Sequence, residues 1–353
     1  MRGPTVQEVT VKRSSITLIV LSAALALVGA ACSSDDVGGD DFRVAIIAPS
    51  ASNDLAFTQS IVDSANRLME DGVIGEVAIT DGTFVVEDAA VAIRDYATED
   101  FDLVIAHGSQ YGGSLQEIAP DFPEVAFAWG TAADTFGLPN VFSYEAASDE
   151  GGRVMGIMAA ALSESNNIGI VGPIEVGDAK LYVDGFEAGV LAQNPSATVN
   201  INYIDSFSDV ALASEAAQSL ISAGADVMSG TAQMTVGAVG VAKTEGVAWF
   251  GTQSNQTTLA PEIVVASQVY HWEHMLEEMI GKIGDGTLGG ELYKITFANE
   301  GLVIEFNEDY PLPDDVKQLG EDAIAVFEDE GGAGTKAGRG ITGAPDRPNT
   351  RDV

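Results

Sequence analysis

The sequence predicts an α/β fold made of two doubly wound parallel-sheet lobes joined by a hinge. Short, continuously apolar segments alternate with segments whose apolar residues recur at helical spacing, which is typical of a parallel sheet covered by helices on both faces. This alternation runs twice in series along the chain. The length of 353 residues fits two domains, and a hydrophobic content of 46% is typical of a globular protein rather than a disordered one.

The first series of elements opens with the apolar segment 42–48, which is predicted to be a buried strand. The next segment, 55–70, carries Phe57, Ile61 and Leu68 at helical spacing and is predicted to be a helix. The later elements of this series are strands at 76–79, 103–106 and 125–129, and helices at 86–96 and 113–118.

The pattern restarts after the apolar segment 141–144 and predicts the second lobe. Its helices are expected at 151–162, 181–192, 210–223 and 237–243, and its strands at 168–171, 198–203, 226–229 and 248–250. A strand at 263–269 and a helix at 273–283 are predicted to return to the first lobe, and 302–306 is predicted to form a late strand.

These elements divide the chain into two lobes, each built from two separate segments. The N-terminal lobe is assigned to 42–143 plus about 268–288, and the C-terminal lobe to 144–267 plus about 289–330. The expected crossings between lobes lie near Ser143-Tyr144, Gln268-Val269 and Gly286–Gly290. The Gly/Thr/Pro-rich stretch 331–353 is predicted to be a disordered tail, although its cations leave a functional basic tail as the alternative.

The N-terminus has the pattern of an export signal. Cations at Arg2, Lys12 and Arg13 precede an apolar run of about 16 residues, which is short for a membrane span of about 20. The single cysteine, Cys32, follows Val-Gly-Ala-Ala and resembles the lipidation site of bacterial lipoproteins, with Gly29 where leucine is usual. We therefore expect a signal peptide at 1–31, lipidation at Cys32 and a flexible tether at 32–41. The alternative is a plain cleavage site that happens to adjoin a cysteine.

The charge balance excludes several classes of partner. Sixteen Lys and Arg against 53 Asp and Glu give a net charge of −37, so the surface repels phosphate backbones and anionic membranes alike. No nucleic-acid partner is expected. Such acidity concerns solubility and environment, for example a saline habitat, rather than the fold.

Motifs for catalysis and for cofactors are missing. The loop after the first strand, 48–54, contains no glycine to admit a dinucleotide pyrophosphate, and no phosphate-binding loop or nucleophile elbow occurs. His271 and His274 lie three residues apart and could form a metal pair, but a solvated helix face is the favoured interpretation. The sequence therefore predicts no enzyme, no cofactor and no metal.

A ligand cleft is what remains, because in open α/β sheets ligands bind beyond the carboxyl ends of the strands. The residues at those positions mix amides, hydroxyls and aromatic rings with few charges, which suits a flat, neutral ligand that forms hydrogen bonds. The alternative is that Phe57, Trp129 and Phe207 belong to the core or its rim. The candidate ligand-binding residues are Asn53, Asp54, Phe57, Ser109, Gln110, Trp129, Phe207, Thr231, Gln253 and Trp272.

Several motifs, in order and spacing, resemble those of the basic membrane protein (BMP) substrate-binding lipoproteins. They are Asn-Asp-Leu-Ala-Phe-Thr-Gln at 53–59, Asp-Gly-Phe-Glu-Ala-Gly at 184–189, Ser-Phe-Ser-Asp at 206–209, Gly-Ala-Asp-Val at 224–227 and Phe-Gly-Thr-Gln-Ser-Asn-Gln at 250–256. The resemblance implies a type I periplasmic-binding fold and delivery of purine nucleosides or bases to an ABC importer. It also implies that Phe57 and Phe207 stack on the ligand, with Asn53, Asp54 and Gln253 among its polar contacts.

Two departures from the family pattern bear on the ligand. Gln253 stands where the family has an aspartate, and a carboxylate suits a ribose diol because it accepts two hydrogen bonds. Pro49 and the segment Tyr270-His271-Trp272 resemble a branch associated with bare purines. Whether the ligand is a purine base or a purine nucleoside stays open.

The resulting expectation is an extracytoplasmic, lipid-anchored solute-binding protein that is monomeric and works with ABC permease subunits. Ligand bound by both lobes would favour their closed arrangement. A sensor lipoprotein for a sugar or signalling molecule is the alternative, and an exported hydrolase is a further one. A transcriptional repressor of the same fold is excluded, because it would need a basic N-terminal DNA-binding module.

Overall fold

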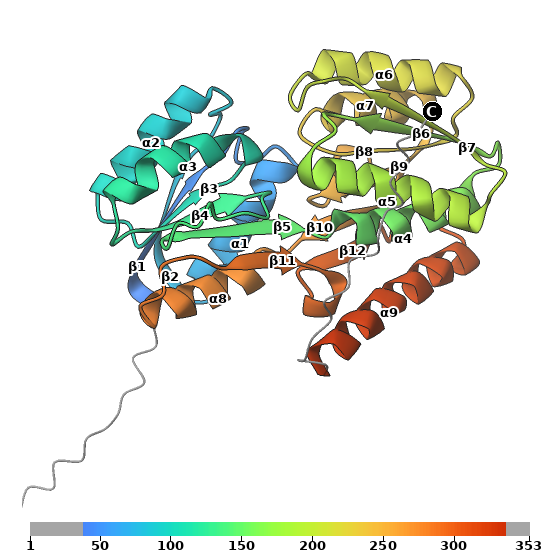
Figure 1. Ribbon diagram of the computed structural model, residues 1–353. Helices are drawn as coiled ribbons and strands as arrows, with labels where there is room; N and C mark the ends of the chain where they lie inside the picture. Colours follow the sequence, from blue (N-terminus) through green and yellow to red (C-terminus); the bar gives the residue numbers. More distant parts are fainter. Residues whose placement is uncertain (1–37, 337–353) are drawn as a thin grey trace, which may run out of the picture. The chain divides into compact units, whose positions relative to one another are not determined.

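Two six-stranded sheets organise the chain (Figure 1). The structure is a computed structural model that describes residues 38–336. Helices cover both faces of each sheet, so the prediction of two doubly wound α/β lobes is confirmed. The predicted signal peptide at 1–31 and the predicted lipidation site, Cys32, lie outside the described residues.

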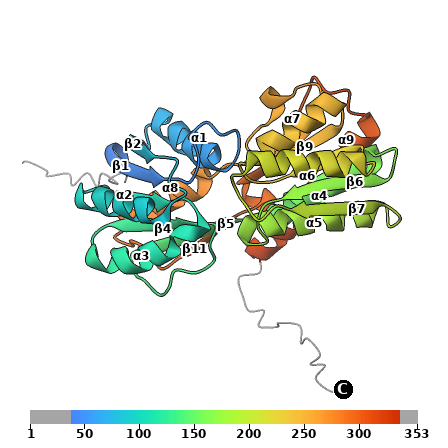
Figure 2. The same ribbon diagram turned by 90° about the horizontal axis from the view of Figure 1, so that it is seen from above.

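The first sheet has the strand order β11-β5-β4-β3-β1-β2, with every neighbouring pair parallel. Side chains alternate across β1, so Val44 and Ile46 pack with α1 and α8, whereas Ala45 and Ile47 pack with α2 and α3. Figure 2 shows α1 and α2 on opposite faces of this sheet. The elements are β1 (Gly39–Ile47), α1 (Phe57–Glu70), β2 (Ile74–Thr80), α2 (Val86–Thr98), β3 (Leu103–Ala106), α3 (Gly112–Ile118), β4 (Ala126–Gly130), β5 (Val141–Ala146), α8 (Glu273–Gly284) and β11 (Leu292–Ile295).

The second sheet has the order β12-β10-β9-β8-β6-β7, in which only the β10–β12 pair is antiparallel. Ile168 and Ile170 of β6 pack with α4 and α5, and Val171 packs with α6 and α7 on the other face. The elements are α4 (Ser148–Leu162), β6 (Asn167–Gly172), α5 (Gly177–Gln193), β7 (Thr198–Tyr203), α6 (Val210–Ser222), β8 (Val227–Gly230), α7 (Thr235–Glu245), β9 (Ala248–Gln253), β10 (Val264–Tyr270), β12 (Leu302–Phe306) and α9 (Asp314–Lys336).

The chain passes between the two sheets after β5, after β10 and after β11. The third crossing was expected at Gly286–Gly290, but β11 still pairs with β5 of the first sheet, with Leu292 opposite Ser143. Gly286 and Gly290 have positive φ values of 86° and 81°. Their turns bring the chain back from α8 to the edge of the same sheet, which is why the glycine-rich segment does not cross to the second lobe.

The strand expected at 263–269 also differs in its lobe. It forms β10, which lies between β9 and β12 in the second sheet, and only α8 after it belongs to the first lobe. The sequence of an apolar strand does not indicate which sheet the strand joins, because its partner strands are remote in sequence.

Both ends of the described region are more ordered than predicted. Strand β1 begins at Gly39, whose amide donates to the carbonyl of Val73 at 2.9 Å, so residues 39–41 belong to the sheet and not to a tether. Helix α9 continues to Lys336, so residues 331–336, expected in a disordered tail, are helical. The rest of that tail, 337–353, lies outside the described residues. Among the helices of 38–336, none has the length and apolarity needed to span a membrane.

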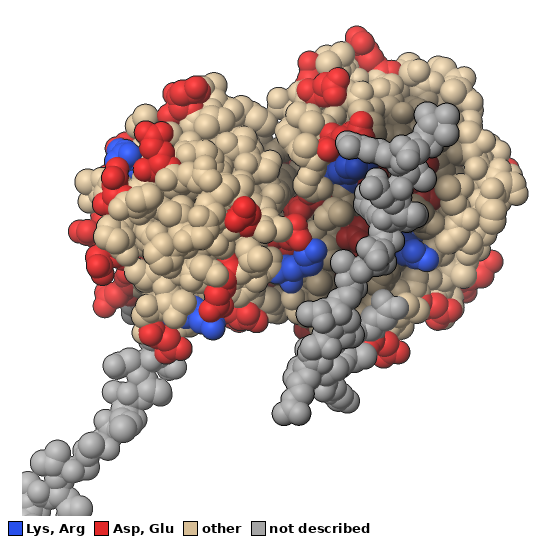
Figure 3. Space-filling model, viewed as in Figure 1, with Lys and Arg blue, Asp and Glu red and all other residues tan. Residues whose placement is uncertain are grey.

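Acidic side chains dominate the visible charge of the surface (Figure 3). Most cations of the described region are already paired with carboxylates, as in Arg43–Glu76 at 2.7 Å and Lys180–Asp184 at 2.7 Å. Exposed pairs of this kind contribute little to stability, because water and salt screen the two charges. Their consequence is electrostatic: pairing removes positive patches and leaves the surplus of carboxylates to set the surface potential.

Helices α4 and α5 approach so closely that glycine is required on both. A Cβ at Gly156 of α4 would overlap the carbonyl oxygen of Phe186, and one at Gly189 of α5 would overlap the carbonyl oxygen of Arg153. These contacts are with backbone atoms, which cannot swing aside as a long side chain can. The glycines therefore fix how α4 and α5 lie together on the second sheet.

We predict that Gly156→Ala lowers the free energy of unfolding by about 1–3 kcal/mol, because the added methyl group forces two helix backbones apart. Gly240→Ala in α7 is the matched control, since a Cβ there meets nothing within 4 Å and helix propensity should add about 0.5–1 kcal/mol. Urea denaturation of both variants measures the difference. Equal effects of the two changes would show that α4 and α5 are not tightly packed.

Candidate functional site

A cavity that is open to solvent lies at the carboxyl ends of strands from both sheets. This is where ligands bind in open α/β folds. Both lobes contribute to its wall. The lining residues are Pro49, Phe57, Phe84, Gly108, Ser109, Gln110 and Thr131 from the first lobe, and Val176, Gly177, Asp178, Ala179, Phe207, Ala232, Gln233 and Gln253 from the second.

Half of the residues singled out from the sequence come together in this cavity. They are Phe57, Ser109, Gln110, Phe207 and Gln253. The other five, Asn53, Asp54, Trp129, Thr231 and Trp272, are not part of its lining. Position after a strand places a residue at the right edge of the sheet but does not decide which way its side chain points.

Asp54 acts on the backbone at the start of α1. Its Oδ1 accepts from the amides of Ala56 and Gln59 at 2.9 and 3.1 Å, and its Oδ2 accepts from Ser50 Oγ at 2.6 Å. Burial raises the pKa of Asp54, and the hydrogen bonds from Ser50 and the amides oppose that rise. The carboxylate thus anchors the loop that presents Phe57, while neighbouring Asn53 is exposed.

Both tryptophans have structural contacts of their own. Trp129 donates from Nε1 to the carbonyl of Gly108 at 3.1 Å and stacks on Phe136 with ring centroids 4.7 Å apart. Trp272 is fully buried and donates from Nε1 to Ser60 Oγ at 2.8 Å. The interpretation of Trp129 as a core or rim residue, which the sequence left open, is the one its contacts favour.

Phe57 is backed by a buried histidine that holds no charge. The ring of His107 stacks on Phe57 with centroids 3.9 Å apart and an interplanar angle of 12°. Burial lowers the pKa of His107 to about 3, against a hydrogen bond to the Phe57 carbonyl that raises it. Because that carbonyl only accepts, His107 Nε2 carries the proton, and Nδ1 accepts from the Tyr144 hydroxyl at 2.7 Å. Phe57 is thereby fixed from behind and lines the cavity with little freedom to move.

Phe207 approaches the same cavity from the second lobe. It lies in the loop after β7, where Ser206 Oγ accepts from the amides of Ser208 and Asp209 at 3.2 and 3.1 Å. The Phe207 carbonyl accepts from the amide of Met234 at 3.0 Å, which ties this loop to the one after β8. Two phenyl rings from opposite lobes therefore face one cavity, each on an anchored loop.

Three residues that line this cavity have strained backbone. Thr131, Ala232 and Gln253 line it with φ values of 55°, 78° and 72°, a left-handed region that non-glycine residues seldom adopt. Leu55, two residues before Phe57, has φ 54°. Such strain persists only where the surrounding structure enforces it, and it is enriched at functional sites.

Unpartnered oxygen atoms also collect at the cavity. Among the described residues, Gln233 Oε1, Gln253 Oε1 and both carboxyl oxygens of Asp178 are buried without a hydrogen-bond partner. The hydroxyl of Thr231, next to the cavity-lining Ala232, is buried and unpartnered as well. Buried polar groups are normally satisfied, so this group of acceptors is arranged for something other than the folded chain itself.

Asp178 is one of the lining residues that the sequence analysis missed, as are Phe84, Thr131 and Gln233. Burial raises the pKa of Asp178 to about 8, the Glu145 carboxylate adds to the rise, and the nearby Ala146 amide opposes it without completing a hydrogen bond. A signal was available, since Asp178 follows the first strand of the second lobe, β6, at the start of α5. It was overlooked because five residues separate it from the end of that strand.

The lobes also touch directly beside the cavity. Ser254 Oγ of the second lobe donates to the carbonyl of Ala56 at 2.8 Å, and Gln256 Nε2 donates to the carbonyl of Leu55 at 3.3 Å. These bonds join the segment after β9 to the loop before α1. A change in the spacing of the lobes would therefore be felt at Phe57 and Gln253 together.

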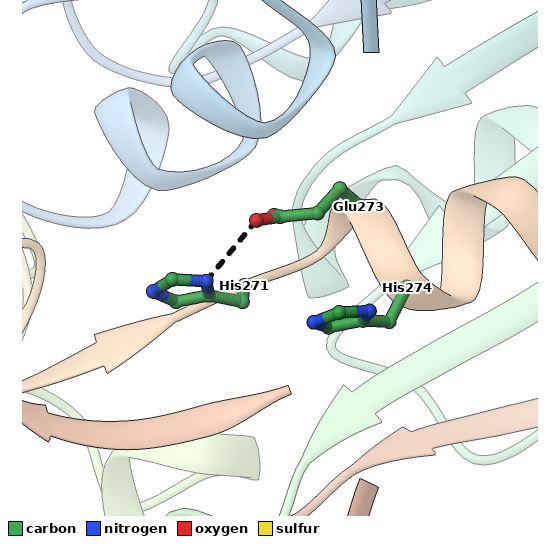
Figure 4. A group of neighbouring side chains, drawn as sticks. All are labelled: His271, Glu273 and His274. Carbon is green, nitrogen blue, oxygen red and sulfur yellow. Dashed lines mark ion pairs between the residues drawn. The ribbon is translucent and has the colours of Figure 1, made fainter. Parts of the chain in front are cut away.

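The suspected metal pair forms a cluster with Glu273 away from the cavity (Figure 4). Ligand atoms of His271, Glu273 and His274 lie within 4.8 Å of one another, and His271 Nδ1 is 3.1 Å from a Glu273 oxygen. Arg67 donates to both Glu273 oxygens at 2.8 Å. Burial alone would raise the pKa of Glu273, but the bonds from His271 and Arg67 outweigh it and lower that pKa. The Arg67 guanidinium is therefore already paired with the Glu273 carboxylate, which a metal ion would need as a ligand.

The fold and cavity agree with comparisons to known proteins. A family model described as ABC transporter substrate-binding protein, PnrA-like, matches residues 42–323. This chain belongs to the Bmp family. As a Bmp protein it is an ABC transporter solute-binding protein and not an enzyme, as the sequence predicted.

Individual relatives share this architecture at modest identity. A purine-binding protein of Brucella abortus is 26% identical over 238 residues, which is 67% of each chain. The transcriptional activator protein Med of Bacillus subtilis is 27% identical over 79% of this chain and 86% of its own. A solved ABC transporter solute-binding protein from Conexibacter woesei is 25% identical, covers 82% of this chain and 97% of its own, and has a TM-score of 0.67.

Membership in the family indicates where the Bmp protein works and with what kind of partner. Solute-binding proteins of ABC importers work outside the cytoplasm, bind a small molecule and present it to permease subunits. The cavity between the two lobes is the candidate site for such a molecule in this chain.

We predict that the ligand-free protein loses stability between pH 6.5 and about 8 because of Asp178. Its folded pKa lies above the ordinary 3.8, so the stability it contributes is complete below about pH 4 and is lost as the pH rises through about 8. His107 acts oppositely and only below pH 6.5, because its folded pKa is lowered to about 3. Urea unfolding at a series of pH values measures the slope.

Asp178→Asn is the matched variant, since the amide has the same shape and does not titrate. Its free energy of unfolding should stay level between pH 6.5 and 8. Parallel slopes in the two proteins would contradict the assignment to Asp178.

Proposed function

We propose that this protein binds a purine-type ligand in the interlobe cavity and delivers it to the permease of an ABC importer. The observation that carries the proposal is the pair of phenyl rings, Phe57 and Phe207, which line one cavity from opposite lobes. Aromatic faces bind flat, conjugated rings by stacking, and amide side chains can then contact the ring edges. The purine-binding relative from Brucella abortus supports this choice of ligand.

The polar wall is proposed to select a base over a nucleoside. Gln253 lines the cavity with 4% of its surface exposed, at the position where the sequence pattern of the family has an aspartate. An amide replaces two strong acceptors by one acceptor and one donor, which weakens pairing with a ribose diol. Ser109 and Gln110 of the first lobe are proposed to supply further hydrogen bonds.

Asn53 and Asp54 act from outside the cavity in this proposal. Asp54 anchors the start of α1 through the amides of Ala56 and Gln59, and so holds Phe57 in place. Trp129, Thr231 and Trp272 are likewise assigned to support of the walls rather than to ligand contact. Because both lobes contribute contacts, a bound ligand favours their closed arrangement, which the permease would recognise.

We predict that Phe57→Ala and Phe207→Ala each weaken purine binding by about 1–3 kcal/mol, or roughly 5- to 150-fold, through loss of stacking. Phe306→Ala on β12 is the control, since that partly buried ring does not line the cavity. The full chain, purified in detergent and stripped of carried-over ligand by unfolding and refolding, is titrated calorimetrically with adenine, guanine and their nucleosides.

Two results would decide against the proposal. Unchanged affinity in both phenylalanine variants would remove these rings from the site. A wild-type protein that ignores every purine and is stabilised by sugars in a thermal-unfolding panel would keep the solute-binding function and overturn the purine ligand. A ligand at 100 times its Kd adds about 2.7 kcal/mol, so the panel detects even moderate binders.

Lipid anchoring through Cys32 is part of the same proposal. The support is sequence alone: the chain's single cysteine follows a charged start and an apolar run. We predict that Cys32→Ser abolishes incorporation of labelled palmitate in bacterial cells and moves the protein from the detergent phase to the aqueous phase. Ser34→Ala serves as the control. Detergent partitioning that is the same in both variants would show that Cys32 is not the anchor.

A further inference from the structure

Asp178 combines deep burial with carboxyl oxygens that complete no hydrogen bond, although the amides of Ala146 and of Asp178 itself are near enough to lower its pKa. It is the second residue of α5, is 4% exposed and lines the interlobe cavity. Neither of its carboxyl oxygens has a hydrogen-bond partner among the described residues. Isolated buried carboxyls are costly to a fold, so a position like this is retained where a ligand completes it.

The charged and titratable groups around Asp178 are committed elsewhere. The ammonium of Lys294 on β11 is 2.6 Å from Glu145 on β5, and pairs with that carboxylate rather than with Asp178. The hydroxyl of Tyr144 is bonded to His107, and that of Tyr270 on β10 is bonded to Ser148 at 2.6 Å. Tyr182 on α5 itself is bonded to Ser229.

This setting favours the neutral form of the carboxyl. Desolvation disfavours the charged form, and the Glu145 carboxylate repels a second negative charge nearby. Lys294 lowers the pKa of Asp178 only in part, because its ammonium is paired with Glu145. A neutral carboxylic acid has one O–H donor and one C=O acceptor side by side, whereas a carboxylate only accepts.

We propose that Asp178 binds, as a neutral carboxylic acid, a ligand edge on which an N–H donor adjoins a ring-nitrogen acceptor. The amino group and neighbouring ring nitrogen of a 6-aminopurine form such an edge, and two parallel hydrogen bonds result. A 6-oxopurine presents an N–H and a carbonyl at that position, with which the acid can also pair once its proton is on the other oxygen, whereas an unsubstituted purine has no donor at C6. The inference rests on the proposed purine function and names the substrate class within it.

The test compares adenine, hypoxanthine and unsubstituted purine on the wild type, Asp178→Asn and Asp178→Ala by calorimetry. Asparagine reproduces the donor and acceptor of a neutral acid, so Asp178→Asn should bind adenine within about threefold of wild type. Asp178→Ala should lose about ten- to a hundredfold in adenine affinity and lose the preference for adenine over unsubstituted purine. Asp184→Asn, exposed on the same helix and not part of the cavity lining, is the control and should keep that preference.

A pH series separates the neutral acid from a carboxylate. Wild-type affinity for adenine should fall about tenfold between pH 7 and pH 9, because only about a tenth of Asp178 stays neutral one unit above its pKa of about 8. Asp178→Asn should show no such fall. The ring of His107 stays neutral throughout this range, since its pKa is lowered to about 3.

Each contrary outcome is distinct. If the wild type binds adenine and Asp178→Ala binds it equally well, Asp178 is not a ligand contact and the inference fails alone. If Asp178→Asn loses adenine as Asp178→Ala does, a carboxylate rather than a neutral acid is bound, and the inference is overturned. If the wild type binds no purine at all, the proposed function fails and the inference fails with it.

Discussion

Parallel strand pairing is the constraint on which the candidate site depends. In a parallel sheet all strands end at one edge, so the loops that follow them gather there whatever their distance in sequence. The described chain forms two such sheets and crosses between them three times. The edges at which their strands end meet at one cavity. Residues as remote as Pro49 and Gln253 line the same wall for this reason.

Neutral buried groups keep the surroundings of the cavity nearly uncharged, although the protein as a whole is strongly acidic. The His107 ring supports Phe57 without a charge, and Asp178 is pressed toward its neutral form by burial and by Glu145. The Asp54 carboxyl group is anchored by backbone amides and does not line the cavity. A flat, uncharged ring therefore meets little electrostatic opposition inside a molecule whose surface carries a large negative charge.

The strained backbone at the cavity depends on close packing elsewhere in the protein. Left-handed backbone at Thr131, Ala232 and Gln253 is tolerated because rigid strands and helices on both sides leave no alternative path. The backbone contact of α4 with α5, set by Gly156 and Gly189, is part of that rigidity. The result is a pre-formed wall rather than one that has to be ordered when the ligand arrives.

Local pattern was enough to predict the two α/β lobes, nearly every strand and five of the lining residues, because apolar periodicity and strand ends are properties of neighbouring residues. The family was indicated instead by the resemblance of short motifs, such as that at 53–59, to those of BMP proteins. Local pattern took β10 for the start of the return to the first lobe, although the boundary near 268 left most of this strand in the second, and it put the third crossing before β11 instead of after it, since strand partners are chosen by contacts remote in sequence. Asp54, Trp129 and Trp272, predicted as ligand contacts, do not line the cavity, whereas Asp178 lines it and was not predicted. Which way a side chain turns, and whether it finds a partner, is settled by packing between elements, and no short stretch of sequence contains that information.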